Sequence, residues 1–374
     1  MIKILHLITE LDVGGAEQML QKLVTHMDSG HFHNSVVSMT DRGVLGKKIS
    51  SRGIRVFELG MSRGRPDPKG FFKFYRLLKK ESPDIIQCWL YHADLLGLIT
   101  GRAARIKKIA WGIRCSDMDF ADYRFTTKTT VKLCAQLSSG LDGIVVNSEK
   151  GMEVHRQLGY FTEKMHLIPN GFDLTRFSPD NSAKGWLLNR LGLPRYTTLI
   201  GLVARYDPVK DHETFLKAAA LLAETEKSAH FVLVGKEIGP ENYKLRPLLG
   251  GPLKKRVHLL GYRQDIPRLT AAFDIASSAS KGEGFSNTIG EAMACAIPCV
   301  ATDAGDSARI LGDTGIIIPP GDPKSLARAW RDVIARTPAE RRTMGERARR
   351  RVAENFELGK VTRQFEAFYR HLLD

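Results

Sequence analysis

The chain has 374 residues, of which 43% are hydrophobic and 26% charged, a composition that is ordinary for a globular protein and excludes a disordered or low-complexity one. Because a single hydrophobic core rarely grows this large, we expect two domains of about 150 to 200 residues each. The formal net charge of +15 suits nucleic acid, an anionic membrane surface or phosphorylated substrates, and charge alone does not choose among them.

The sequence lacks the patterns of a transmembrane helix, a signal peptide and a cysteine-based site. No apolar run approaches the roughly 18 residues of a transmembrane helix. The opening "MIKILHLITELDVGG" meets Glu10 and Asp12 too early for a signal peptide, so we expect a first strand there. The five cysteines form no CxxC pair, which predicts neither a zinc site nor a disulfide framework and favours a reducing cytoplasm.

In chain order, short β-rich apolar runs alternate with longer amphipathic stretches, which is typical of βα units on a parallel sheet. In the first half this pattern predicts helices at 15–27, 69–81, 90–105 and 125–138 and strands at 2–8, 35–39, 54–59, 84–88, 108–113, 143–148 and 164–169. The stretch "PNGFDLTRFSPDNSAKG", residues 169–185, is rich in turn-forming residues and interrupts the alternation. We interpret it as the domain junction.

A second βα series follows the junction. It predicts strands at 197–205, 230–235, 256–261, 273–279, 297–303 and 315–319 and helices at 209–226, 242–250, 264–271, 285–296 and 322–336. The charged tail from residue 338 is predicted to be helical and could pack on either domain. In two doubly wound domains, ligands are expected at the carboxyl ends of the strands, so the turns from strand to helix are the candidate sites.

The first of these turns reads "ELDVGGAEQ". Gly14 and Gly15 would let backbone N–H groups approach a phosphate at the start of the following helix. The turn lacks the three spaced glycines of a dinucleotide fingerprint, and Asp41 is a weak candidate for its acidic residue. A tight turn that needs a positive φ is the alternative explanation of the glycine pair.

The turn "VARYDPVKDH" leads from a strand into a helix of the second series. It carries Arg205 and Lys210 around Pro208, and a guanidinium and an ammonium near a helix start suit a diphosphate. Surface Arg and Lys are common, so a solvated loop is the alternative.

The stretch "KGEGFSNTIGEA" places two glutamates around a helix start. If the helix begins near Ser286, Glu283 lies in the loop ahead of it and Glu291 in the second turn, about 10 Å further along. The N–H groups of the first turn lie between them and form an anion site. A sugar, a diphosphate and a ribose would match the order carboxylate, helix dipole, carboxylate. The alternative is a dipole-favouring acid followed by an exposed surface glutamate.

In this order, the motifs resemble those of the family 4 glycosyltransferases of the GT-B fold. The resemblance covers nearly the whole chain and rests on "GGAEQML", "VNSE", "IPNGFDLTRF", "VARYDPVKDHETFLKAAALL", "HLLGYRQDIPRLTAAFDI", the E-x7-E element from Glu283 to Glu291 and "GIIIPPGDPKSLARA". It implies two doubly wound Rossmann-like domains facing across a cleft. Residues 1–170 would bind the acceptor and 171–356 the nucleotide sugar, with the helix at about 357–374 packing back on the first domain.

The resemblance also implies a retaining enzyme that uses a UDP- or GDP-sugar and acts on a glycan or lipid-linked glycan. Arg205 and Lys210 would hold the diphosphate, Glu291 the ribose hydroxyls, and Glu283 the transferred sugar. The remaining donor-binding residues would be Gly14, Gly15, Phe285, Ser286, Asn287 and Thr288. Such enzymes generally need no metal, because cations and helix dipoles neutralise the leaving group, so we expect "DMD" at 117–119 not to be a metal site.

The group that assists the acceptor stays open. Many relatives carry a histidine after the fifth strand, where this chain has "WGIRCSD" with Arg114. His92 in "WLYHADLLG" is the other catalytic candidate, and it could equally be an ordinary helix-start residue. Arg114 would then bind an acidic or phosphorylated acceptor.

Residues 62–80, "SRGRPDPKGFFKFYRLLKK", interleave basic and aromatic side chains, and "GRAARIKK" and "RFTTKTTVK" extend the pattern. An amphipathic helix of this kind suits an anionic leaflet, which predicts peripheral attachment at the cytoplasmic membrane face. The alternative is that the aromatic residues pack on the sheet and the cations are solvated. Nucleic acid is not expected, because no binding motif accompanies the charge.

Three other activities remain as alternatives. A sugar-nucleotide epimerase or hydrolase would have a similar fold, and a phosphorylase would need a pyridoxal-phosphate lysine that no motif nominates. A nucleotide-sugar-binding partner without catalytic activity is the alternative outside the enzymes.

Overall fold

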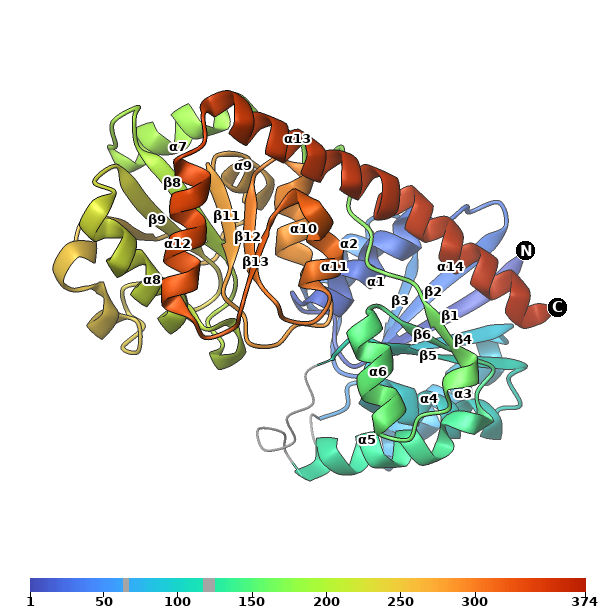
Figure 1. The fold of residues 1–374 in the computed structure, drawn as a ribbon. Helices are drawn as coiled ribbons and strands as arrows, with labels where there is room; N and C mark the ends of the chain where they lie inside the picture. The colour runs from blue at the N-terminus through green and yellow to red at the C-terminus, as the bar shows by residue number, and fades with distance from the viewer. Residues whose placement is uncertain (63–66, 117–124) are drawn as a thin grey trace. The chain divides into compact units, whose positions relative to one another are not determined.

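The structure is a computed structural model that describes residues 1–62, 67–116 and 125–374 (Figure 1). The chain divides into two compact units, unit 1 (Met1–Gly171 and Leu358–Asp374) and unit 2 (Phe172–Glu357). Each unit contains one parallel sheet with helices packed on it. The predicted fold class, α/β with two doubly wound domains, is confirmed.

Unit 1 is built on a seven-stranded sheet in the order β3-β2-β1-β4-β5-β6-β7, with every pair parallel. Its strands are β1 Ile2–Ile8, β2 Phe32–Ser38, β3 Arg55–Glu58, β4 Ile85–Trp89, β5 Lys108–Ile113, β6 Gly143–Val146 and β7 Met165–Leu167. Its helices are α1 Gly15–His26, α2 Gly43–Ser50, α3 Pro68–Glu81, α4 Tyr91–Ala103, α5 Phe125–Leu137, α6 Glu149–Gln157 and α14 Leu358–Leu373.

The sheet of unit 1 separates two hydrophobic cores, because successive strand residues point to opposite faces. Ile4 and Ile8 of β1 pack in one core with α1 and with Phe365 of α14. Leu5 and Leu7 pack in the other core, with side chains of α3, α4 and α5. The helix α14 therefore supplies part of the core of unit 1, although it follows unit 2 in the chain.

Unit 2 is built on a six-stranded parallel sheet in the order β10-β9-β8-β11-β12-β13. Its strands are β8 Thr198–Val203, β9 Ala229–Val234, β10 Val257–Leu259, β11 Ile275–Ser278, β12 Cys299–Thr302 and β13 Ile316–Ile318. Its helices are α7 Ala183–Leu191, α8 His212–Thr225, α9 Ile266–Ala271, α10 Asn287–Ala294, α11 Ser307–Leu311, α12 Pro323–Ile334 and α13 Pro338–Asn355.

One predicted helix is wrong. Residues 242–250 form no α-helix; the chain there makes only the short 3-10 turns Arg246–Leu249 and Gly251–Leu253. Pro247 and Pro252 lack the N–H that a helix interior needs, and Gly250 and Gly251 lower helix propensity further. Four helices of the structure are not among those named from the sequence: α2, α6, α7 and α11.

Both sheets reverse their strand order at one place. In unit 1, β1 lies between β2 and β4, and in unit 2, β8 lies between β9 and β11. The loops that follow β1 and β4, and those that follow β8 and β11, therefore leave in opposite directions and open a crevice at the carboxyl ends of the strands. Candidate sites are expected at these two edges.

Two further predictions can be compared with the described residues. No helix among them is both long and apolar enough to cross a membrane. The five cysteines are free thiols, so the structure contains no disulfide framework.

Candidate active site

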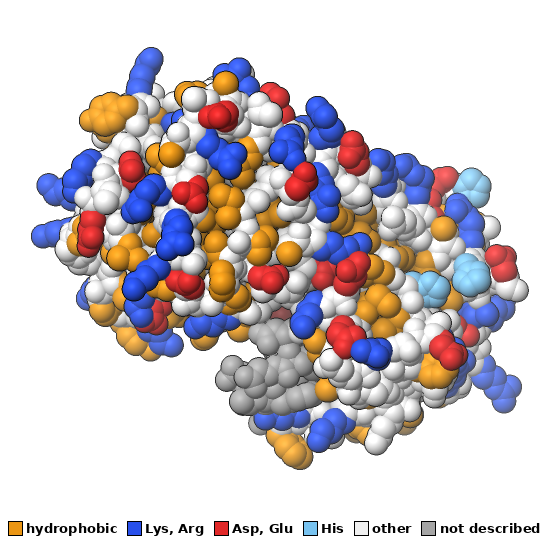
Figure 2. Space-filling view, in the orientation of Figure 1, with side chains coloured by type: hydrophobic (Ala, Val, Ile, Leu, Met, Phe, Trp, Pro, Cys, Tyr) orange, Lys and Arg blue, Asp and Glu red, His pale blue; other side chains and the backbone are white. Residues whose placement is uncertain are grey.

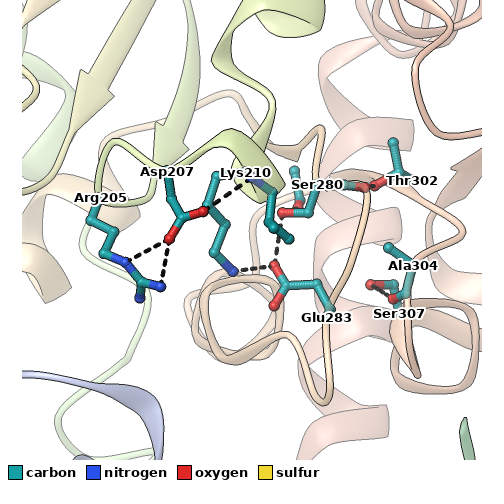
Figure 3. Close-up of polar contacts among 10 residues, drawn as sticks. Arg205, Asp207, Lys210, Ser280, Glu283, Thr302, Ala304 and Ser307 are labelled. Atoms are coloured by element: carbon teal, nitrogen blue, oxygen red, sulfur yellow. Dashed lines mark hydrogen bonds and ion pairs between the residues drawn. The ribbon is translucent and has the colours of Figure 1, made fainter. Parts of the chain in front are cut away.

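The loop after β8 is shaped by one aspartate. Asp207 accepts a hydrogen bond from the Val209 N–H (3.1 Å) and so caps the 3-10 turn Pro208–Lys210. Its other carboxylate oxygen accepts from Nε (3.1 Å) and Nη2 (2.7 Å) of Arg205 (Figure 3). The side chain of Arg205 remains 58% exposed, so its guanidinium is held in place by Asp207 and still reaches solvent.

Lys210, at the end of the same turn, reaches the loop after β11. Its Nζ lies 2.6 Å from Oε1 of Glu283, and Ser280 Oγ donates to the same oxygen at 2.8 Å (Figure 3). The side chains of Lys210 and Glu283 are only 22% and 11% exposed, so this ion pair is screened less by water than a surface pair. The structure thus brings together two of the predicted site residues.

Backbone contacts hold these loops against each other. The Lys281 N–H donates to the Val209 carbonyl at 2.8 Å, and Thr302 Oγ1 donates to the Ser280 carbonyl at 2.6 Å. Gly305, at φ +57°, lies so close that a Cβ on it would be 2.0 Å from the Glu283 carbonyl oxygen. The position of Glu283 therefore depends on a glycine in the loop after β12.

The helix α10 begins one residue after Ser286, as predicted. Ser286 occupies the N-cap position, yet its hydroxyl makes no capping hydrogen bond. The residue is 1% exposed, and its Oγ has no hydrogen-bond partner among the described residues. The N–H groups of the first turn of a helix have no carbonyl partner within it, so the buried hydroxyl of Ser286 lies at a helix end that favours negative charge. Such a place suits an anion or a sugar hydroxyl.

Glu291 lies in the second turn of α10 and is 7% exposed. The alternative that it is an exposed surface residue is therefore wrong. The side chain of Phe285, also predicted to bind the donor, packs in the core of unit 2 against Phe172 and Phe356, with ring centroids 6.0 and 5.5 Å away. Only the backbone of Phe285 can contribute to the site.

His212, the first residue of α8, was not predicted as part of the site. It is 3% exposed, and the backbone of Ala204 lies close enough to hydrogen-bond with its imidazole. Burial lowers the pKa of His212 to about 4, and the positive charge of Lys210 also lowers it. A neutral imidazole therefore lies beneath the loop that carries Lys210. The sequence gives no sign of this, because burial of a helix-start histidine depends on the packing around it.

In unit 1, the glycine pair lies after β1, at the start of α1. Gly14 is the extended N-cap residue (φ −142°, ψ 173°), so the alternative of a turn with positive φ is wrong. A Cβ on Gly14 would lie 2.2 Å from Oε2 of Glu17, whose carboxylate folds back over the helix start. Gly14 and Gly15 are thus placed at a helix N-terminus as predicted, but a carboxylate of the chain itself already lies beside it.

His92 lies in the first turn of α4, after β4. Leu90, which precedes the helix, has φ 75° and ψ 148°, a region that only glycine occupies without strain. His92 is half-buried, and burial lowers its pKa. The ring is therefore neutral near pH 7 and can accept a proton.

Arg114 directly follows β5 on the same edge. Its guanidinium stacks on the ring of Trp89, 4.3 Å from the centroid, and lies 5.6 Å from that of Phe365 in α14. Nη1 donates to Asn170 Oδ1 at 3.1 Å, whereas Nε and Nη2 are buried without a hydrogen-bond partner among the described residues. Burial lowers the pKa of Arg114 to about 10, so the group stays charged at neutral pH.

Asp94, a carboxyl group that interacts electrostatically with Arg114, is a weak counter-ion for it. Burial raises the pKa of Asp94 well above its ordinary value, which favours the uncharged form of that carboxyl. A buried guanidinium with two nitrogens that donate no hydrogen bond to the described residues is costly unless an anion approaches it. The arrangement is therefore suited to bind a phosphate or carboxylate group.

No metal cluster is found in the part of the chain that the structure describes: no group of three or more His, Cys, Asp or Glu side chains could hold an ion there. The sequence "DMD" at 117–119 lies outside the described residues. Its role stays a prediction.

Known proteins resemble both halves of the chain. Residues 13–176 match the family model described as Glycosyltransferase Family 4, and residues 197–336 match the one described as Glycosyl transferases group 1. The chain is 31% identical over 248 residues to the Escherichia coli UDP-Gal:alpha-D-GlcNAc-diphosphoundecaprenol alpha-1,3-galactosyltransferase, covering 63% of this chain and 62% of that one. The match thus spans less than two thirds of that relative. The putative glycosyltransferase EpsF of Bacillus subtilis is 27% identical over 92% of this chain and 90% of its own.

Among solved structures, Anabaena HepE in complex with UDP superposes with a TM-score of 0.86 at 25% identity, covering 99% of this chain and 100% of HepE. Two parallel α/β units of seven and six strands, with this likeness, define the GT-B class of fold. Within that class, the matched families span most of the sequence on both sides of the junction. The chain belongs to the family 4 glycosyltransferases.

Proposed function

We propose that the chain is a retaining glycosyltransferase that moves a hexose-type unit from a UDP-sugar to a lipid-linked glycan. The observation that carries this proposal is the Lys210–Glu283 ion pair of 2.6 Å beside the start of α10, where the hydroxyl of Ser286 is buried without a partner among the described residues. A cation, a carboxylate and a helix N-terminus at the switch point of one sheet match the successive parts of a nucleotide sugar.

In this proposal Lys210 and Arg205 take the charge of the departing diphosphate. Both cations are already paired with carboxylates of the loops, Lys210 with Glu283 and Arg205 with Asp207. A bound diphosphate would exchange these carboxylates for phosphate oxygens, and Glu283 would then accept hydrogen bonds from sugar hydroxyls. Glu291, one turn further into α10, would hold the ribose hydroxyls.

The transfer step needs no side-chain nucleophile. The bond from the sugar C1 to the phosphate oxygen breaks, the bond from C1 to the acceptor oxygen forms on the same face, and the acceptor proton passes to the departing diphosphate. The cations stabilise the charge that develops on the leaving group, which is the largest contribution expected from such a site. The donor is expected to react without a metal ion.

For the acceptor we propose that His92 orients the attacking hydroxyl by a hydrogen bond, while the proton still passes to the departing diphosphate, and that Arg114 binds an acidic group, such as the diphosphate of a lipid-linked glycan. Support comes from the unused, buried N–H groups of Arg114 and from the name of the E. coli relative, whose acceptor is a diphosphoundecaprenol. An acceptor of this kind would place the enzyme at the cytoplasmic face of the cell membrane.

A panel of UDP- and GDP-sugars tests the donor. We expect a UDP-sugar to raise the melting temperature and to be transferred to an undecaprenyl-diphosphate-linked sugar with retention at C1, as read from the anomeric coupling in the NMR spectrum. If only GDP-sugars raised the melting temperature, the base of the donor would be guanine and not uracil. An inverted product would overturn the retaining mechanism, and binding without transfer or hydrolysis would indicate an inactive binding protein.

A further inference from the structure

The helix α3 presents a basic face to solvent. Asp67 caps the helix by accepting from the Gly70 N–H at 3.0 Å, and Phe74 and Leu78 are fully buried in the core of unit 1. On the opposite side, side chains at helical spacing are exposed; we name this set the α3 basic face: Lys69, Phe72, Arg76, Lys79 and Lys80. The acidic residue at the end of α3, Glu81, is paired with Arg55 at 2.5 Å.

The structure divides the aromatic residues of this segment. Phe74 lies in the core, Phe71 and Tyr75 are half-buried, and Phe72 alone among the four is 62% exposed. The alternative that the aromatic residues pack on the sheet is therefore right for Phe74 and Tyr75, which lie in or pack against the core of unit 1. Residues 63–66 of the predicted basic stretch lie outside the described residues.

The neighbouring helices add exposed apolar side chains. The helix α4 packs against both α3 and α5, so the three helices form one layer over the sheet. Ile99 of α4 is 50% exposed, and Leu133 and Leu137 of α5 are each 40% exposed, next to the exposed Lys132. Figure 2 shows hydrophobic side chains beside Lys and Arg along the edge where Figure 1 places α5.

Exposed cations next to exposed apolar side chains favour a lipid surface over a nucleic acid as the partner of these helices. Lys and Arg side chains occur over the whole face visible in Figure 2, so positive charge alone does not single out α3. A nucleic acid would pair with the cations but would gain nothing from Ile99, Leu133 and Leu137. An anionic bilayer can accept cations at its phosphates and apolar side chains at the acyl boundary.

We infer that the α3–α4–α5 layer is the surface with which the protein docks on an anionic lipid leaflet, through the α3 basic face together with Ile99, Leu133 and Leu137. The inference rests on the proposed function in that a lipid-linked acceptor would lie in the same leaflet. Docking by this layer would hold unit 1 at the membrane without a spanning segment.

Flotation with vesicles tests this surface. The full chain is mixed with vesicles of phosphatidylcholine alone or of phosphatidylcholine with phosphatidylglycerol, and binding is measured as salt is raised. We expect binding to the anionic vesicles only, weakening with salt. The double variant K69E/R76E should lower binding at least about tenfold, since each cation near the surface contributes about 1 kcal/mol. Phe72→Ser with Leu133→Ser should lower binding several-fold at every salt concentration.

The matched control is R342E/R350E, which changes the net charge equally at exposed positions of α13 in unit 2. It should leave vesicle binding intact. The inference would be overturned if both charge variants lost vesicle binding equally or if the wild type did not bind anionic vesicles. It would also be overturned if K69E/R76E weakened the binding of duplex DNA and left vesicle binding unchanged. All variants should keep the wild-type melting temperature and its rise with UDP-sugar, so that failure of docking is distinguishable from failure of the proposed function.

Discussion

The cationic side chains at the carboxyl edges of the two sheets differ in whether they are paired with carboxylates. At the edge of unit 2, the cations are paired with carboxylates of neighbouring loops: Lys210 with Glu283, Arg205 with Asp207, and Lys281 with Asp211 at 3.2 Å. At the edge of unit 1, Arg114 is buried on an aromatic ring with two nitrogens, Nε and Nη2, that have no hydrogen-bond partner among the described residues.

The difference indicates two kinds of binding. Paired side chains hold their positions before a ligand arrives, and a diphosphate would only exchange one partner for another. An unpaired buried cation raises the free energy of the empty site, and an anionic ligand would relieve that cost. The edge of unit 2 is therefore suited to a ligand with both hydroxyl and phosphate groups, and the edge of unit 1 to a ligand with an anionic group such as a phosphate.

The largest effect is expected at Lys210. Lys210→Ala removes the cation proposed to stabilise the leaving group and should raise the activation free energy by about 2 to 4 kcal/mol, a roughly 30- to 1000-fold fall in kcat/KM. Steady-state kinetics with saturating acceptor measures this. The control is Lys217→Ala, which breaks the exposed Lys217–Glu213 pair of 2.7 Å and should leave kcat/KM unchanged. Equal rates for wild type and Lys210→Ala would remove this residue from the site.

The two glutamates should separate binding from turnover. Glu291→Gln, deep in α10, should raise the Kd for UDP about tenfold, because a hydrogen bond to a charged group contributes about 1.5 to 3 kcal/mol. Glu283→Gln should instead lower kcat by about 10- to 100-fold with a smaller change in the Kd for UDP, since the proposal gives Glu283 the sugar hydroxyls and no atom of the nucleotide. Calorimetry and initial rates give the two quantities. If both substitutions change the same quantity by the same factor, the assignment of separate roles is wrong.

Replacement of Arg114 should weaken acceptor binding without lowering the melting temperature. Replacing an incompletely paired buried cation by an apolar side chain is often neutral or stabilising, so Arg114→Met should keep or raise the melting temperature. The KM for a diphosphate-linked acceptor should nevertheless rise about tenfold, the loss expected for one charge-assisted hydrogen bond, while the Kd for UDP stays constant. A lower melting temperature with an unchanged KM would mean that Arg114 only supports the core around Trp89.

The smallest effects concern buried histidines. Burial lowers the pKa of both His6 in unit 1 and His212 in unit 2 to about 4. Below about pH 6.5 each imidazole binds a proton in the unfolded chain but not in the folded chain. The contribution of the two histidines to the free energy of unfolding is therefore fully present above that pH and decreases as the pH falls toward 4. Each histidine should cost about 1 kcal/mol at about pH 5.5.

Leucine variants compare the two histidines. His6 is bonded to Asn34 (3.0 Å) and Trp89 (3.3 Å), so His6→Leu leaves buried polar groups unpaired and should destabilise the protein at pH 7. The contact of His212 that bears on its pKa is with the backbone of Ala204, so His212→Leu should destabilise the protein less than His6→Leu at pH 7 and should weaken the acid sensitivity. Denaturant titrations at the two pH values measure both effects. Equal losses at pH 7 would contradict the contrast.

Most of the fold and the site residues at the carboxyl edge of unit 2 could be predicted from the sequence, because both depend on patterns that are local in the chain. Apolar runs mark the strands, and Lys210, Glu283 and Ser286 lie at short, fixed distances along the chain from strand ends, so neighbouring strands bring them together. The edge of unit 1 was harder, because the aromatic surroundings of Arg114 come from β4 and from α14 at the far end of the chain. The burial of His212 and of three aromatic residues of the basic stretch depends on tertiary packing, which local spacing does not reveal.

The placement of α14 has a consequence for synthesis. Phe365 and Tyr369 of this helix are fully buried in the core of unit 1, yet a ribosome makes them only after all of unit 2. The unit whose translation begins first is therefore completed after unit 2, and its Trp89 stays uncovered by Phe365 until α14 has been made. A premature stop within α14 is expected to damage the amino-terminal half of the protein while the contiguous half made in between folds normally.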